Sequence, residues 1–306
     1  MFVAAVKPVV YIAAETELWP NLFARLSREG VPILVVNGRI SDEAFPKYRM
    51  VKGLLRRTLR SVRMFCMQSA TDAERVLALG VDSKCVKMAG NIKFDNAPEA
   101  RGMLARDIGF EDKDVILVGG STHPGEEEIL LDVFLGLRQA YPDLRLILAP
   151  RHPERAKAVA KAVRAVGLAP RMFSGGNSRL TEQDVLIVDT IGHLLTLYSV
   201  ATIVFVGKSL TVKGGHNIIE PAVFARPVII GPHTENFKDI TQVFLKQHAV
   251  IQVKDAVGLK DAVQGFLRDK KACLDIGARA RAVVRSHQGA TVRTMDIIHD
   301  VIEGRV

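Results

Sequence analysis

The sequence predicts an α/β protein with parallel sheets, divided into two domains. Three observations support this: 306 residues of average hydrophobic and charged content, short apolar runs that alternate with helical patterns, and a loop-like stretch at residues 91–103. Apolar strands that alternate with helices are typical of parallel sheets covered on both faces. We expect two facing Rossmann-like domains, residues 1–96 and 97–306, with the last helix either in the second domain or packed back on the first.

The strand candidates are short runs rich in β-branched residues. In the first domain they are residues 8–15, 31–37, 64–69 and 86–91. In the second domain they are residues 114–120, 144–150, 184–189, 201–207 and 226–231. Helical patterns lie between them, among them residues 126–140, 153–167, 217–226 and 256–269. Because ligands bind beyond the carboxyl ends of strands in open parallel sheets, the residues after each strand are the candidate site residues.

Composition excludes several classes of protein. Average hydrophobic and charged contents, 48% and 25%, exclude a disordered or fibrous chain. Cys66, Cys85 and Cys273 lie far apart, which argues against a zinc site or a disulfide scaffold and suits a reducing cytoplasm. No apolar run reaches the roughly 20 residues of a membrane span, and no signal-peptide pattern opens the chain. A cytoplasmic protein is expected.

The formal net charge of +9 is unevenly distributed. Residues 47–63 contain seven basic residues and no acidic one, with leucines interleaved. On a helix this spacing gives an apolar stripe flanked by arginines, as in helices that lie on anionic membrane surfaces. A solvated helix that packs its leucines on the core explains the pattern equally well. Aromatic residues for base stacking are scarce here, so no nucleic-acid partner is expected.

The richest candidate site follows the strand predicted at residues 201–207. The glycine pair 214–215 lets the backbone approach a ligand, and the next helix directs free N–H groups toward it, which suits a phosphate. Lys213 and His216 would add positive charge, and Glu220 would accept hydrogen bonds from ribose hydroxyls. The alternative is a capping box in which Asn217 and Glu220 only begin the helix.

Charged residues follow three other strands. Arg151 and His152 come after residues 144–150, where arginine suits bidentate contact with phosphate or stacking on a base; a surface pair of Arg151 with Glu154 is the alternative. Glu15 and Glu17 end the first strand, where one carboxylate of the pair either enters a cleft or complements the dipole of the next helix. Lys93 follows the fourth strand and, taken alone, is explained as a solvated lysine.

Polar residues also follow the strand predicted at residues 114–120. Ser121, Thr122 and His123 stand at the start of the next helix, where Thr122 is most simply explained as an N-cap. Two strand rims of this kind, facing each other, would enclose an inter-domain cleft, which is a favoured place for a small-molecule site.

Five motifs occur together and in order. They are ETELWPN from residue 15, GNIKFD from 90, GSTHPGEE from 120, PRHPER from 150, and GGHNIIEPA from 214, the last followed by GPHTENFKDI. Together they resemble the 3-deoxy-D-manno-oct-2-ulosonic acid (Kdo) transferases of lipid A assembly, over essentially the whole chain. The resemblance implies a GT-B fold. It also implies inverting, metal-independent transfer of Kdo from CMP-Kdo, without a cofactor, to the anionic lipid A precursor at the cytoplasmic face of the inner membrane.

The resemblance also implies roles for residues. Glu15 and Lys93 match the pair that stabilises the transition state. The positions that contact CMP are matched by Pro150, Arg151, Ile191, Gly192, His193, Asn217, Ile218, Ile219 and Glu220. Further contacts to the phosphate or the cleft are expected from Ser121, Thr122, His123, Lys213, Gly214, Gly215 and His216. A carboxylate suits the positive charge of the sugar as CMP leaves, while cations and a helix N-terminus suit the departing phosphate without a metal.

Three departures from the family pattern bear on function. His193 stands where an acidic residue is expected, and Lys208 stands where the family has glycine. The segment that carries the general-base glutamate and an amino-terminal anchor have no counterpart. The amino-terminal domain is therefore expected to be incomplete, and the chain to be poorly soluble and to transfer Kdo only at a trace rate. The alternatives are a truncated, non-catalytic CMP or CMP-sugar-binding protein, and another GT-B nucleotide-sugar enzyme, against which ETELWPN and PRHPER argue.

Overall fold

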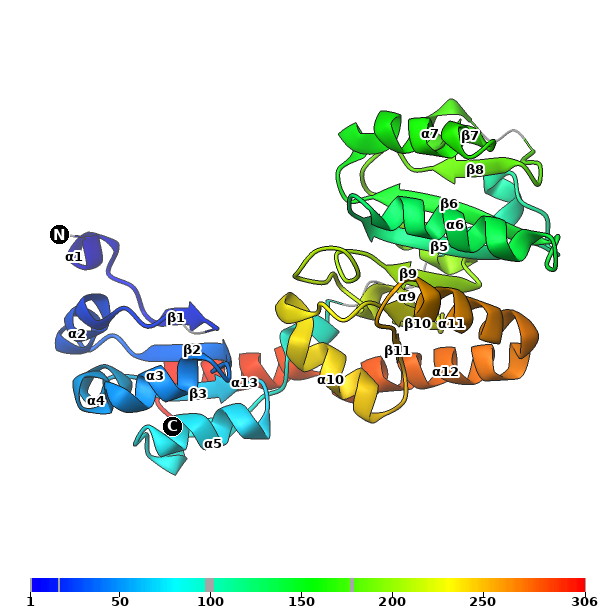
Figure 1. Ribbon diagram of the computed structural model, residues 1–306. Helices are drawn as coiled ribbons and strands as arrows, with labels where there is room; N and C mark the ends of the chain where they lie inside the picture. The colour runs from blue at the N-terminus through cyan, green and yellow to red at the C-terminus, as the bar shows by residue number, and fades with distance from the viewer. Residues whose placement is uncertain (1, 16, 97–101, 177–178, 306) are drawn as a thin grey trace. The chain divides into compact units, whose positions relative to one another are not determined.

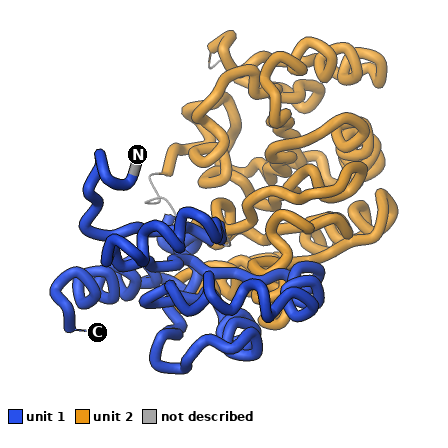
Figure 2. The backbone as a smooth tube through the Cα atoms, turned by 90° about the vertical axis from the view of Figure 1, so that its left-hand side faces the viewer, with its two compact units in different colours: residues 1–96, 287–306 blue, residues 97–286 orange. Residues whose placement is uncertain are grey.

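Two parallel sheets organise the chain, as the computed structural model of residues 2–15, 17–96, 102–176 and 179–305 shows (Figure 1). Each sheet belongs to its own compact unit: unit 1 is Met1–Asn96 with His287–Val306, and unit 2 is Ala97–Ser286 (Figure 2). The α/β class with parallel sheets, predicted from the sequence, is confirmed. Part of the predicted linker, residues 97–101, and Thr16 of ETELWPN lie outside the described residues.

Unit 1 contains a four-stranded parallel sheet whose spatial order follows the chain. Its strands are β1 (Tyr11–Ala14), β2 (Ile33–Gly38), β3 (Met64–Met67) and β4 (Val86–Met88). Its helices are α1 (Phe2–Val6), α2 (Pro20–Arg28), α3 (Ala44–Met50), α4 (Lys52–Arg60), α5 (Ala70–Ala78) and α13 (Ala290–Ile302), with short 3-10 turns η1 (Ser83–Cys85) and η2 (Ile92–Phe94).

Both faces of this sheet are covered. On one face, buried side chains of α2, α4 and α5, such as Phe23 and Leu59, pack against β2 and β3. On the other face, Met64 and its neighbours pack against Ile297 of α13. The Asp95 carboxylate accepts a hydrogen bond of 2.6 Å from the backbone N–H of Gly289, just before α13 begins. The last helix of the chain therefore completes unit 1.

Unit 2 contains a seven-stranded parallel sheet in the order β11-β10-β9-β5-β6-β8-β7. Its strands are β5 (Val115–Thr122), β6 (Leu144–Pro150), β7 (Ala169–Met172), β8 (Asp184–Ile187), β9 (Ile203–Val206), β10 (Val228–Ile230) and β11 (Ile251–Gln252). Its helices are α6 (Glu126–Arg138), α7 (Ala156–Ala165), α8 (Leu194–Val200), α9 (Ile219–Val223), α10 (Lys238–Lys246), α11 (Ala256–Arg268) and α12 (Lys270–His287), with 3-10 turns η3 (Ala105–Ile108), η4 (Pro153–Arg155), η5 (Phe173–Gly175) and η6 (Glu235–Phe237).

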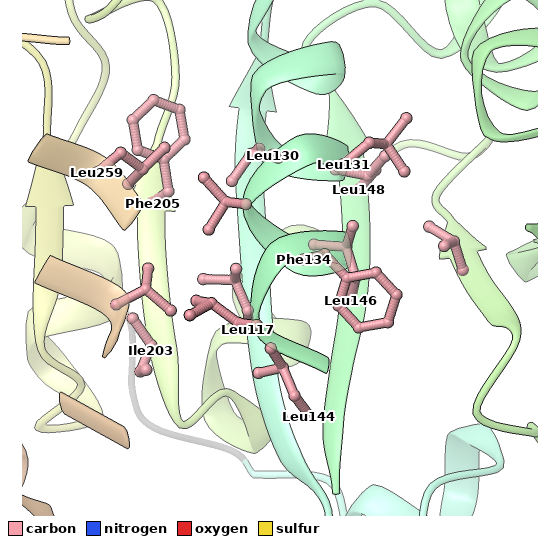
Figure 3. Close-up of a cluster of buried hydrophobic side chains, with 14 of the residues drawn as sticks. Leu117, Leu130, Leu131, Phe134, Leu144, Leu146, Leu148, Ile203, Phe205 and Leu259 are labelled. Carbon is pink, nitrogen blue, oxygen red and sulfur yellow. The ribbon is translucent and has the colours of Figure 1, made fainter. Parts of the chain in front are cut away.

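The main core of unit 2 lies on one face of the sheet, under α6, α7, α11 and α12. Figure 3 shows Leu130 and Phe134 of α6 over the strands that carry Leu117 and Leu146. Burial of one such side chain contributes about 1.5–3 kcal/mol. On a rim of this rigid sheet, loops can hold side chains in fixed positions.

A close contact fixes the second half of β5. A Cβ atom on Gly120 would lie only 2.1 Å from the hydroxyl oxygen of Tyr198 in α8. Tyr198 is fully buried and burial raises its pKa well above the usual value. Glycine at position 120 is therefore required for α8 to pack against β5.

No helix among the described residues is long and apolar enough to cross a membrane.

Candidate functional site

Strained backbone marks the carboxyl ends of several strands. Of the seven described non-glycine residues with positive φ, four lie at such ends: Glu15 (57°), Asn37 (52°), Ser121 (53°) and Lys208 (56°). The left-handed conformation costs a residue with a side chain roughly 1–2 kcal/mol, and strain of this kind clusters at functional sites. Three of the four are positions that the sequence singled out; Asn37 is new.

In unit 2, three histidines gather at the ends of neighbouring strands. Nε2 of His123 lies 3.1 Å from Nε2 of His216, and their rings stack with centroids 5.3 Å apart. His152 meets His123 edge to face at 6.0 Å. His123 follows β5, His152 follows β6, and His216 lies on the loop after β9, so the order β9-β5-β6 brings them together.

Two of the clustered histidines, His123 and His216, have a lowered pKa. Burial, and after it the charges of Arg151, His123, Lys208 and His152, lower the pKa of His216 to about 4. Burial also lowers the pKa of His123. A pair of neutral rings can share one N–H···N hydrogen bond. Arg151 and Lys208 place positive charge beside His216.

Glu220 lies in the same environment. Burial raises the pKa of its carboxyl group, while the Asn217 hydrogen bond and the Arg151 charge oppose the rise. The Asn217 side-chain N–H donates to Glu220 Oε1 at 3.1 Å, and Asn217 Oδ1 accepts from the backbone N–H of Ile219 at 3.1 Å. The alternative explanation, an Asn217–Glu220 capping box, is wrong, because α9 begins at Ile219 with Ile218 as its N-cap.

A buried carboxylate that sequence reasoning missed holds the loop after β9. Glu126 is fully buried and accepts hydrogen bonds from the backbone N–H groups of Lys208 (2.9 Å), Ser209 (3.0 Å) and Leu210 (3.0 Å). It also accepts a bond of 2.9 Å from the N–H of His123. Glu126 therefore fixes Lys208 and His123 relative to each other, and its only sequence signal is its place in GSTHPGEE.

Thr122 does not cap α6. Its hydroxyl donates to Glu127 Oε1 at 2.8 Å, and Gly125 is the N-cap of the helix. Glu127 also binds the Arg155 guanidinium at 2.8 Å. The N-cap explanation of Thr122 is therefore wrong, because a buried ion pair offers its hydroxyl a stronger acceptor. Ser121, beside it, is buried.

The remaining predicted residues lie as follows. Pro150 is the buried last residue of β6, and the exposed Arg151 after it donates its backbone N–H to Thr122 at 3.0 Å. Glu154, the alternative partner of Arg151, lies instead 3.6 Å from His152.

After β8 come the exposed Ile191, Gly192 and His193, and the His193 ring lies 4.9 Å from that of Phe173. Lys213 is exposed, while Gly214 and Gly215 are buried with φ of 136° and 75°.

In unit 1, the structure brings Glu15 and Lys93 together. Lys93 Nζ lies 3.5 Å from Glu15 Oε1, and the two side chains are 39% and 48% exposed. Glu15 follows β1 and Lys93 lies in η2, after β4. The pair is accessible to a ligand at the carboxyl rim of the sheet.

A polar network that sequence reasoning missed positions η2. Asn37, only 3% exposed, accepts a 3.1 Å hydrogen bond from the backbone N–H of Ile92. The Gln68 amide donates to the Asn37 carbonyl oxygen at 2.9 Å and accepts from Asn91 at 2.9 Å. Asn91 in turn accepts from the backbone N–H of Lys93 at 3.0 Å. The lysine is thus held by a chain of amides from three strand ends.

Within the described part of the chain, no group of three or more His, Cys, Asp or Glu side chains is placed to hold a metal ion.

A family model and several relatives share one description. The family model "3-Deoxy-D-manno-octulosonic-acid transferase (kdotransferase)" matches residues 1–96. The 3-deoxy-D-manno-octulosonic acid transferase of Haemophilus influenzae is 32% identical, over 100% of this chain and 72% of its own length. That of Bordetella pertussis is 32% identical, over 98% of this chain and 71% of its own length.

Solved structures give the fold. The carboxy-terminal CMP-Kdo binding domain of WaaA from Acinetobacter baumannii matches with a TM-score of 0.54 and 31% identity, over 56% of this chain and 90% of that chain. MnaA of S. aureus, solved with UDP, matches with a TM-score of 0.62 over 99% of this chain and 78% of that chain, and at 15% identity it shares the fold alone. The GT-B class implied by the motifs is confirmed. With two relatives above 30% identity, each covered over more than two thirds of its length, the chain belongs to the 3-deoxy-D-manno-octulosonic acid transferase family and is a Kdo-transferring glycosyltransferase.

Proposed function

We propose that this chain transfers Kdo from CMP-Kdo to the lipid A precursor, with inversion and without a metal ion. The observation that carries the proposal is the cluster of Arg151, His216 and Glu220 on the rim formed by β9, β5 and β6. The likeness of unit 2 to a domain described as binding CMP-Kdo supports the choice of donor.

The donor site has the chemistry that a sugar nucleotide needs. The Arg151 guanidinium suits bidentate contact with the phosphate of CMP, and the Glu220 carboxylate suits the ribose hydroxyls. Lys208 and the glycine loop add a cation and backbone close to the same point. As the bond between sugar and phosphate breaks, the phosphate gains negative charge. Preorganised cations stabilise this charge, as a metal ion does in other enzymes.

The Glu15–Lys93 pair suits the sugar side of the reaction. A carboxylate stabilises the positive charge that develops at the anomeric carbon as CMP leaves, and Lys93 holds that carboxylate in place. In a single displacement the acceptor hydroxyl attacks the anomeric carbon from the face opposite CMP and releases its proton to water, while the bond to the CMP phosphate breaks, which inverts the configuration. Both side chains are partly exposed, so a substrate can reach them.

The proposal also includes the anionic membrane surface at which the acceptor is bound. The basic run of residues 47–63 lies on α3, α4 and the turn that follows, and Arg56, Arg57 and Arg60 are exposed. Basic residues near an anionic membrane contribute about 1 kcal/mol each. We place the protein on the cytoplasmic face of the inner membrane, bound peripherally through this surface.

Incubation of the 306-residue chain with CMP-Kdo and lipid A precursor, in excess EDTA, tests the proposal. Mass spectrometry detects even a trace of product, and we expect one Kdo-bearing lipid for each CMP released. The Glu15→Gln variant should form about 10²–10³-fold less product, the usual effect of removing a transition-state contact, while Glu74→Gln on α5, equal in charge change, should match the unchanged chain.

Three outcomes contradict the proposal. Binding of CMP-Kdo without lipid product would indicate a non-catalytic CMP-sugar-binding protein. Activity lost in EDTA and restored by a divalent cation would refute metal independence. Retained anomeric configuration of the product would refute the single displacement.

A further inference from the structure

A hollow of about 770 Å³ lies in unit 1 between α2 and α4, which are neighbours in Figure 1. From α4 it is lined by Gly53, Arg56, Arg57 and Arg60, at the i, i+3, i+4, i+7 spacing of one helix face. We call this hollow the arginine groove. A Cβ atom on Gly53 would meet no atom within 4 Å, so the absence of a side chain at this position leaves the groove open.

The groove concentrates uncompensated positive charge. Arg28 of α2 joins Arg56, Arg57 and Arg60 around it, and α2 and α4 contain no acidic residue. None of these four arginines forms an ion pair with a carboxylate in the described ranges, whereas Arg25 on the outer side of α2 pairs with Glu29 at 2.5 Å. Like charges held together repel one another, so an anion in the groove would lower the energy of the whole cluster.

The groove also receives the amino-terminal end of α2. Pro20 and Asn21 line it, and the N-cap residue Trp19 makes no side-chain cap hydrogen bond. The first N–H groups of a helix have no partner within the helix and carry partial positive charge. The groove therefore offers backbone N–H groups from Asn21 onward as well as arginine guanidinium groups, and both kinds of donor suit a phosphate.

Apolar surface adjoins the cationic surface. A second hollow of about 300 Å³, lined by Tyr11, Trp19 and Leu22, shares Pro20 and Asn21 with the first. Trp19 is 57% exposed, and Leu54 at the edge of the groove is 82% exposed. A ligand that covers both regions has a phosphate group and an apolar body.

We propose that the arginine groove binds a phosphate group of the acceptor glycolipid, with the apolar part of the acceptor against Trp19 and Leu54. The inference rests on the proposed function, since it names how the acceptor of that reaction is held. The groove binds and orients the acceptor, and no bond is made or broken there.

Trp19 is the single tryptophan of the sequence, so its fluorescence reports on this surface directly. Lipid A precursor in detergent micelles, before and after enzymatic removal of its phosphates, is titrated into the full chain. The Arg56→Gln/Arg57→Gln variant should raise the Kd for the phosphorylated lipid about tenfold or more, because charge-assisted hydrogen bonds are lost. The control Lys84→Gln/Lys87→Gln removes two exposed charges of the same unit away from the groove and should leave the Kd unchanged.

A third variant separates a phosphate site from a merely basic surface. Gly53→Leu keeps every charge but fills the groove, so we expect weaker binding of lipid A precursor and unchanged binding to phosphatidylglycerol vesicles. Equal affinity for the phosphorylated and dephosphorylated lipids, or an unaltered Kd in Arg56→Gln/Arg57→Gln, would overturn the proposal. Loss of vesicle binding with an unchanged Kd for the lipid would overturn it too, in favour of a membrane surface. The titration requires neither donor nor turnover, so its failure is distinguishable from failure of Kdo transfer.

Discussion

At Lys208, a residue with a long side chain occupies a conformation that glycine adopts freely. Its φ of 56° lies in the left-handed region. Three consecutive N–H groups, beginning with that of Lys208, are bound by the buried Glu126, so the loop cannot relax. Lys208 places a positive charge beside His216, and its strained backbone is the energetic cost of that placement.

Lys208→Gly should therefore stabilise the fold and weaken nucleotide binding. Relief of the left-handed strain, less the greater entropy of an unfolded glycine, should raise the free energy of unfolding by about 0.5–1 kcal/mol. Urea denaturation measures the gain, and calorimetry with CMP measures the lost affinity. Ala225→Gly, at a φ of 55°, is the matched control that relieves the same strain without removing a charge. A loss of stability in Lys208→Gly, or CMP affinity equal to that of the control, would contradict this account.

His216 should make stability depend on pH. Its pKa is about 4 in the folded chain, because burial and the charges of Arg151, His123, Lys208 and His152 disfavour its protonation, against an ordinary value of 6.5. Between these values the unfolded chain binds a proton at this residue and the folded chain does not. The contribution of His216 is therefore fully present above about pH 6.5 and is lost as the pH falls toward 4.

Urea denaturation between pH 7.5 and pH 4, at intervals of about half a pH unit, measures this effect. The free energy of unfolding should fall less steeply with decreasing pH in His216→Asn than in the unchanged chain. Parallel profiles for the two proteins would show that His216 is not protonated preferentially in the unfolded state.

Among the elements, η2 depends on residues from elsewhere in the sheet. It is only three residues long, and side chains of Asn37 and Asn91 bind its backbone N–H groups. Asn37 also has a φ of 52°, which asparagine tolerates better than most residues. The position of Lys93 is therefore set by β2 as much as by its own turn.

Asn37→Ala should destabilise unit 1 and reduce turnover while leaving CMP affinity unchanged. It removes the acceptor for the Ile92 N–H and places alanine in a left-handed conformation, so we expect a loss of about 1–3 kcal/mol. Asn96→Ala, an exposed amide of the same unit, serves as control. The measurements are thermal denaturation, Kdo transfer and CMP titration, and a fall in CMP affinity equal to the fall in turnover would contradict the assignment.

Most strands could be predicted from the sequence, while two edge strands of the larger sheet could not. All nine predicted strands form. Seven of them bury an apolar run, whereas β1 and β4 are largely exposed. The two unpredicted strands, β7 and β11, lie at the edges of the larger sheet; β7 contains Pro170 and β11 has two residues. Edge strands need neither a continuous apolar run nor a full set of backbone donors, so they leave little signal in the sequence.

The predicted site residues came from strand ends, and the residues that hold them escaped prediction. Glu126 binds Lys208 across 82 positions and Asn37 binds Ile92 across 55. Such bonds depend on which strands become neighbours, which local patterns do not specify. The same limit applies to Thr122. Its hydroxyl donates to Glu127, and Glu127 is paired with Arg155, which is distant in the sequence. The residues next to Thr122 therefore do not reveal that it does not cap α6.

For the whole molecule, each unit has its own sheet and core, and the proposed roles divide between them. The proposed CMP contacts lie in unit 2, whereas Glu15 and Lys93 lie in unit 1. The last helix returns to unit 1 after 190 residues of unit 2, a connection that the sequence pattern left open.

Calorimetric titration of the full chain with CMP tests the central claim, that the rim of unit 2 is the donor site. Arg151→Ala should weaken binding by about 1.5–3 kcal/mol, the scale of a hydrogen bond to a charged group. Arg164→Ala, an exposed arginine at the far end of α7, and Lys93→Met in unit 1 should bind CMP as the unchanged chain does. Unchanged affinity in Arg151→Ala, or an equal loss in Lys93→Met, would contradict the assignment of the donor site to unit 2.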